Sequence, residues 1–132
     1  MNIYTSTVFE LESSNYVGEV TIKEIDGKVM AQTEYGDFSL LFSSPGMGIL
    51  DFLCKINTDY LGKKIFTQWL NAFPFPPSND QYVMINERAK FLAEKLLPNL
   101  RHKIKVGEYQ VYEHVANGNN YKEYLAKKGQ NQ

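Results

Sequence analysis

Cysteine and histidine are scarce in this chain of 132 residues, which contains one Cys and two His. Zinc sites need clustered Cys or His side chains at short spacings, and Cys54, His102 and His114 are widely separated in the sequence. We therefore expect no metal site and no cofactor. A lone cysteine forms no disulfide within the chain and fits a reducing compartment, so the expected location is the cytoplasm.

Long apolar runs are also missing from the sequence. No stretch approaches the roughly 18–20 apolar residues that a membrane-spanning helix needs. Residues 1–7 carry neither a basic leader nor an apolar run. We expect a soluble protein with no secretory signal and no membrane partner.

No catalytic signature stands out. Cys54 follows Leu53 in a predicted apolar helix, where a small buried filler is the ordinary interpretation and a nucleophile paired with a histidine base is the alternative. Fifteen acidic residues define no particular carboxylate pair. The prediction is a protein without catalytic residues, and a small enzyme with an unrecognised site is the alternative.

Apolar and aromatic residues are abundant enough for a folded core. The chain is 43% hydrophobic and 14% aromatic, which is too rich for disorder. Its length lies within the usual range of one domain, and it shows no internal repeat. We predict a single domain over residues 1–132, with a sheet in residues 1–42 and a mainly helical part in residues 47–128.

The sequence of residues 1–42 predicts antiparallel strands. Residues 3–11 are rich in β-branched and aromatic side chains, and residues 18–25 and 28–35 flank Asp26 and Gly27, a pair suited to a two-residue type I′ turn. Gly36 and Asp37 suit a type II′ turn before a strand over 38–42. In residues 28–35 the alternation predicts one covered face with Val29 and Ala31.

Helical spacing dominates after residue 48. Three apolar stripes predict three helices, the second capped by Asn57 or Thr58 and the third opened by a capping box of Ser78 and Gln81 and stopped by Pro98. Gly62 in the second helix indicates a close packing contact or a helix irregularity. The stripes are Ile49, Phe52, Leu53 and Ile56, then Leu61, Ile65, Trp69 and Phe73, then Tyr82, Ile85, Ala89, Leu92 and Leu96.

Residues 108–116 fit either a helix or a strand, and helix is the preferred interpretation. A loop over 117–120 and a short helix over 121–128 follow. The complete prediction is an α+β fold, in which an N-terminal antiparallel meander of three or four strands is packed by three to five C-terminal helices.

Charge is divided between the two parts of the chain. Residues 1–54 carry eight acids and two lysines, and residues 55–132 carry twelve basic and seven acidic residues, so the net charges are −6 and +5. The densest basic cluster contains Arg101, Lys103 and Lys105. These three, with Lys122, Lys127 and Lys128 and with Tyr109 or Tyr112 for stacking, define the candidate surface for nucleic acid.

Residues 35–70 carry a pattern found in a known group of proteins. There Tyr35 and Gly36 open a strand, a helix with Phe52 and Leu53 follows, and a block begins with Asp59, Tyr60 and Leu61. This order resembles small proteins encoded by phages and prophages. The resemblance implies a protein that binds and blocks or redirects a host protein, including CRISPR or restriction machinery, and it implies no catalytic residues.

Together these observations predict a phage-derived, non-enzymatic binding protein whose partner is a host protein. A small nucleic-acid-binding protein that uses residues 101–105 is the alternative. The sequence leaves self-association open. The candidate partner-binding residues are Tyr60, Lys64, Arg101, Lys103, Lys105, Tyr109 and Tyr112.

Overall fold

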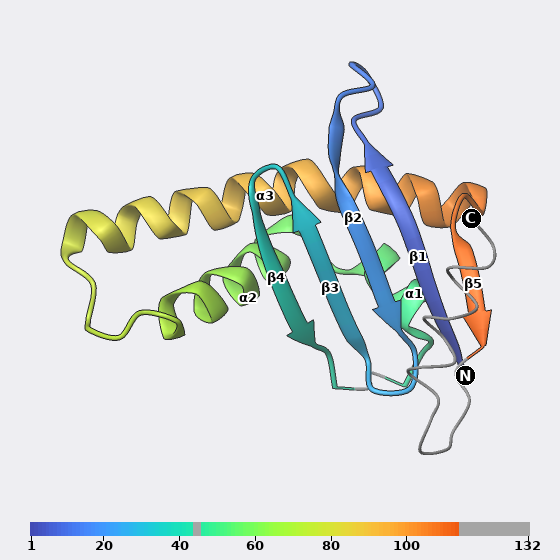
Figure 1. The fold of residues 1–132 in the computed structure, drawn as a ribbon, viewed down its shortest axis with the longest axis horizontal. Helices are drawn as coiled ribbons and strands as arrows, with labels where there is room; N and C mark the ends of the chain where they lie inside the picture. The colour runs from blue at the N-terminus through green and yellow to red at the C-terminus, as the bar shows by residue number, and fades with distance from the viewer. Residues whose placement is uncertain (44–45, 114–132) are drawn as a thin grey trace.

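The structure, a computed structural model, describes residues 1–43 and 46–113. Four strands come first, three helices follow, and a short fifth strand returns to the sheet (Figure 1). The elements are β1 (Asn2–Phe9), β2 (Tyr16–Lys23), β3 (Lys28–Thr33), β4 (Gly36–Leu41), α1 (Ile49–Lys55), α2 (Thr58–Asn71), α3 (Asn79–Val106) and β5 (Gln110–Glu113).

The five strands form one antiparallel sheet in the order β4-β3-β2-β1-β5. All three helices lie on the same side of this sheet, and α3 crosses the strands (Figure 1). The pairing places cross-strand rows of apolar side chains on the covered face. One such row is Tyr4, Ile22, Val29 and Leu40, and the next is Ser6, Val20, Ala31 and Phe38.

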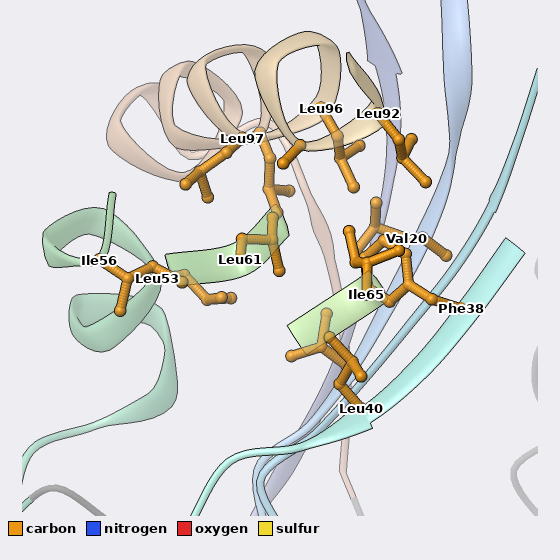
Figure 2. Packing of buried hydrophobic residues seen from close by; sticks show 14 of the residues in the cluster. Val20, Phe38, Leu40, Leu53, Ile56, Leu61, Ile65, Leu92, Leu96 and Leu97 are labelled. Atoms are coloured by element: carbon orange, nitrogen blue, oxygen red, sulfur yellow. The ribbon is translucent and has the colours of Figure 1, made fainter. Parts of the chain in front are cut away.

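The core lies between the covered face and the helices. Val20, Phe38 and Leu40 from the sheet meet Ile65 of α2 and Leu92 of α3 (Figure 2). All five are almost fully buried. Burial of each such side chain stabilises the fold by about 1.5–3 kcal/mol, so this layer holds the helices on the sheet.

The two shorter helices form where their sequences predict, except that Phe73, the last residue of the second stripe, lies beyond α2 and is exposed. Ile49, Leu53 and Ile56 of the first stripe are buried, and the Asn57 side chain accepts a hydrogen bond from the Tyr60 amide at the start of α2. Gly62 is the predicted close contact, because a Cβ atom there would lie 3.4 Å from Cα of Lys90 in α3. The absence of a side chain lets α2 and α3 approach each other.

The long helix α3 begins at the predicted capping box but does not stop at Pro98. It continues to Val106, so the prediction of a stop is wrong. Leu97 and Leu100 on either side of the proline are buried, and the Asn99 side chain donates a hydrogen bond to the Lys95 carbonyl at 2.6 Å. Packing on both sides offsets a cost of about 3 kcal/mol for proline inside a helix.

Both predicted hairpins are present, but their turns differ from the prediction. Lys23 pairs with Lys28, so residues 24–27 form a four-residue loop, and Asp26 lacks the positive φ that a type I′ turn needs. Thr33 pairs with Gly36, so the second turn contains residues 34 and 35 instead of Gly36 and Asp37. Pairing with neighbouring strands sets the register in both cases.

Residues 110–113 form a strand, so the preferred helix over 108–116 is wrong. Gly107 ends α3 with a φ of 73°, a left-handed conformation that glycine adopts without strain, and the chain reverses. The hydroxyl of buried Ser6 in β1 then donates to the Glu108 carbonyl at 3.1 Å. This anchor leads the following residues into pairing with residues 2–5 of β1.

The α+β prediction is confirmed, with a sheet of five strands and three helices in the described residues. Within the part predicted to be mainly helical, β5 is the exception. The predicted loop over 117–120, the helix over 121–128, and His114, Lys122, Lys127 and Lys128 lie outside the described residues.

Candidate interaction surfaces

Residues 1–43 and 46–113 contain no group of three or more His, Cys, Asp or Glu side chains that could hold a metal ion. Cys54 is half-buried on α1, and His102 is half-buried near the end of α3. No helix in the described ranges is long and apolar enough to cross a membrane.

Tyr60 and Lys64 lie one turn apart on α2 and form one cluster with two phenylalanines. The ammonium of Lys64 lies 5.1 Å from the ring centre of Phe42 and 5.7 Å from that of Tyr60. The Phe52 ring lies edge-on to Phe42 at 5.4 Å. Tyr60 remains 41% exposed, so the cluster presents an aromatic ring and a cation to solvent.

Arg101, Lys103 and Lys105 follow each other on the last turns of α3, but two of them have partners within the fold. Nε of Arg101 donates to the Leu53 carbonyl at 3.1 Å and ties α1 to α3. Lys103 forms an ion pair with Glu108 at 2.7 Å. Lys105 is exposed. The cluster therefore offers fewer available cations than its sequence indicates.

The predicted stacking residues Tyr109 and Tyr112 do not share one surface. The Tyr109 ring packs edge-on against Tyr4 on the covered face, with ring centres 5.4 Å apart. Tyr112 pairs with Ile3, which places it on the opposite face, and its hydroxyl donates to the Gln110 side chain at 2.8 Å. Two tyrosines on opposite faces form no continuous platform for successive bases.

A groove of about 710 Å³ lies beside the outer edge of β1. One wall is the end of α3 with Lys103 and the turn after it with Glu108, and the other is β1 with the open sheet face next to it. We call this the β1 groove. Besides those two, its lining includes Thr5, Ser6, Thr7, Phe9, Glu19, Thr21, Gln32, Gly107 and Gln110.

The β1 groove follows the part of β1 that β5 leaves unpaired. β5 pairs only with residues 2–5, and it runs beside only the first part of β1 (Figure 1). The Asn2 carbonyl accepts a hydrogen bond from the Glu24 amide, and beyond the register shift at Val8 and Phe9 the Glu10 amide donates to the Asn15 carbonyl. The main-chain N–H and C=O groups of even-numbered residues of β1 therefore point toward β2. Odd-numbered residues point the other way. The main-chain groups of Thr7 and Phe9 therefore face the groove.

The opposite edge of the sheet is blocked by side chains of α2. The Gln68 side chain accepts a hydrogen bond from the Ser39 amide at 3.0 Å and donates one to the Ser39 carbonyl. Next to it, Nε1 of Trp69 donates to the Asp37 carbonyl at 2.7 Å. The Gln68 amide thus takes the place of a neighbouring strand at the middle of β4.

A second exposed region, absent from the sequence prediction, lies where α2 joins α3. We call it the helical arm, because the joined ends of the two helices project past β4 (Figure 1). Its exposed apolar side chains are Phe73, Phe75, Tyr82, Val83 and Met84, with exposed fractions of 40%, 77%, 47%, 59% and 48%. Phe73 and Tyr82 were predicted to face the core, and their exposure shows that this part of the prediction is wrong. The sequence signal for an exposed region was Val83 and Met84, which lie outside the predicted apolar stripe of α3.

Ion pairs perturb the titration of two carboxyl groups near β1. A hydrogen bond from Lys103 and its charge lower the pKa of Glu108. The pKa of Glu10 is lowered by hydrogen bonds with Ser13 and Lys95, and the Glu10 carboxylate raises the pKa of Lys95 in turn. These pairs link strand β1 and the turn after α3 to the helix.

Comparison with known proteins identifies a family to which the chain belongs. Residues 1–74 match the model of a phage protein family, and the chain belongs to this family. The match spans β1 to the end of α2, so the predicted resemblance to phage proteins is confirmed. No curated protein matches the chain, and no solved structure does.

Proposed function

We propose that this phage protein is a non-enzymatic binding protein that blocks or redirects a host protein, for example a component of a CRISPR or restriction defence. The helical arm carries the proposal. Five large apolar side chains are at least 40% exposed within one short part of the chain. Exposed apolar side chains of this size are enriched at surfaces that other proteins cover.

The phage family supports the identity of the partner. A phage protein is synthesised inside a host cell, so host proteins are available for it to bind. The arm presents Phe75 and Tyr82, aromatic side chains of the kind that dominate binding energy in protein interfaces. Nucleic acid is a weaker candidate, because Arg101 and Lys103 of the basic cluster are hydrogen-bonded within the fold.

A pull-down from nuclease-treated host lysate tests this proposal. The tagged protein should retain one host protein at near-stoichiometric amounts, and the pair Val83→Ser and Met84→Ser should reduce the amount retained by roughly tenfold or more. The matched control is the pair Ile25→Ser and Leu41→Ser, which removes two exposed apolar side chains away from the arm. Retention of nothing, or equal loss in both pairs, would reject the proposal.

A further inference from the structure

We propose that the β1 groove binds an extended segment of a partner protein, which adds to the sheet as a further strand beside Thr7 and Phe9. The inference rests on the proposed function only in that the segment belongs to the bound host protein. The helical arm is a different part of the surface, so the two proposals can fail separately.

The first reason is the unpaired main chain of β1. Thr7 and Phe9 direct their N–H and C=O groups into the groove, and no hydrogen bond joins those groups to any described residue. An added strand lies about 4.8 Å from its neighbour and pairs through these groups. Four hydrogen-bonding groups in one line fit the backbone of an extended peptide better than they fit a compact small molecule.

The second reason is the contrast with β4. There, Gln68 and Trp69 occupy the outward main-chain groups of Ser39 and Asp37, so the fold already has a device that closes an edge. Proteins commonly close exposed edges because an open edge recruits other strands. Beside β1, the turn after α3 contacts the strand at Ser6, and a groove of about 710 Å³ lies between this turn, the rest of β1 and the open sheet face.

The third reason is the charge of the groove. Its charged side chains are Glu19, Lys103 and Glu108, and the last two are paired with each other at 2.7 Å. The Glu19 carboxylate accepts a hydrogen bond from the Thr7 hydroxyl at 2.8 Å, and no cation pairs with it in the described parts of the chain. The favoured segment therefore carries Lys or Arg where it crosses Thr7.

A displayed library of random linear peptides, selected on the full chain, tests this inference without a known partner. The decisive variant is Thr7→Pro, which removes the N–H group that faces the groove and is tolerated at an unpaired strand edge. The matched control is Thr7→Val, which loses the same hydroxyl but keeps the N–H group. Circular dichroism shows whether both variants remain folded.

The selected peptides should contain Lys or Arg, bind Thr7→Val as they bind the original chain, and bind Thr7→Pro roughly tenfold or more weakly. Exchange of the Thr7 and Phe9 amide hydrogens in the unmodified chain should slow when the peptide binds. That second measurement decides the matter if Thr7→Pro fails to fold. Failure to select any peptide, or binding that leaves these amides unchanged, would overturn the inference.

The lysate experiment keeps the two proposals distinct. A host protein that is retained by the unmodified chain and equally by Thr7→Pro supports the proposed function and contradicts the groove as its contact. Groove-binding peptides without any retained host protein support strand addition and count against the helical arm.

Discussion

The two edges of the sheet are finished in different ways. At the β4 edge, the Gln68 side chain bonds both main-chain groups of Ser39, and Trp69 bonds the next outward carbonyl. At the β1 edge, β5 pairs with residues 2–5 and leaves Thr7 and Phe9 without a strand partner among the described residues. In the part of the chain that the structure describes, side chains of α2 close one edge, and half of β1 has no neighbouring strand at the other.

We therefore expect changes at the β4 edge to affect the stability of the fold and changes at the β1 edge to affect binding. Gln68 and Trp69 link the sheet to α2, so a change at the β4 edge should lower the free energy of unfolding. The main-chain groups of Thr7 and Phe9 have no hydrogen-bond partner among residues 1–43 and 46–113. A change there should affect the binding of an added strand more than it affects stability.

The largest expected effect follows Gly36→Ala at the start of β4. Gly36 has a φ of 129°, and a Cβ atom there would lie 2.7 Å from Cζ2 of Trp69. Backbone strain and the displaced indole should together lower the free energy of unfolding by about 3 kcal/mol. Urea unfolding measures the loss.

Gly107→Ala is the matched control for this change. Gly107 also has a positive φ, at 73°, but nothing lies within 4 Å of an added Cβ atom. The Gly107→Ala change should therefore lower the free energy of unfolding by only about 1 kcal/mol, the cost of the left-handed backbone conformation. Equal losses for the two glycines would show that Trp69 does not pack against the start of β4.

A smaller loss of stability is expected for Gln68→Ala. The change leaves the N–H and C=O groups of Ser39 without their partner and should cost about 1–2 kcal/mol. It also opens the β4 edge, so sedimentation should detect self-association that rises with protein concentration. Thr67→Ala on the same helix turn is the control, with an expected change within about 0.5 kcal/mol. A monomeric, fully stable Gln68→Ala protein would show that the edge is not closed by this side chain.

The smallest effect is a pH dependence at the turn beside the β1 groove. Lys103 lowers the pKa of Glu108 in the folded state from its ordinary value of 4.5. The pair therefore stabilises the protein above pH 4.5, and this contribution disappears as the pH falls through the folded pKa. Since Glu108 is exposed, the effect should be small.

Thermal unfolding across this pH range provides the measurement. Glu108→Gln should lower Tm slightly at neutral pH, and the difference from the unmodified chain should vanish in acid. A difference that grows in acid would mean that the carboxylate opposes folding.

Local patterns in the sequence predicted much of this fold. The apolar stripes of α1, α2 and α3, the Asn57 cap and the capping box at Ser78 are set by residues close together in the chain. Two errors came from interactions between distant residues. Pro98 remains helical because Leu97 and Leu100 pack into the core, and residues 110–113 become a strand because β1 lies beside them.

The candidate surfaces were harder to predict for the same reason. Tyr60 and Lys64 are one helical turn apart, and the structure brings them together as their spacing allows. The partners of Arg101 and Lys103 are a carbonyl on α1 and a carboxylate beyond the end of α3, which the basic pattern alone does not reveal. The β1 groove depends on where β5 begins to pair with β1, so no single stretch of sequence encodes it.

Amide hydrogen exchange followed by NMR tests the contrast between the two edges most directly. The Ser39 amide, bonded to Gln68, should exchange slowly, and the Thr7 and Phe9 amides should exchange rapidly although they lie within a strand. In Gln68→Ala, the Ser39 amide should become as fast as the other two. Protection of Thr7 and Phe9 equal to that of Ser39 in the free protein would contradict an open edge at β1.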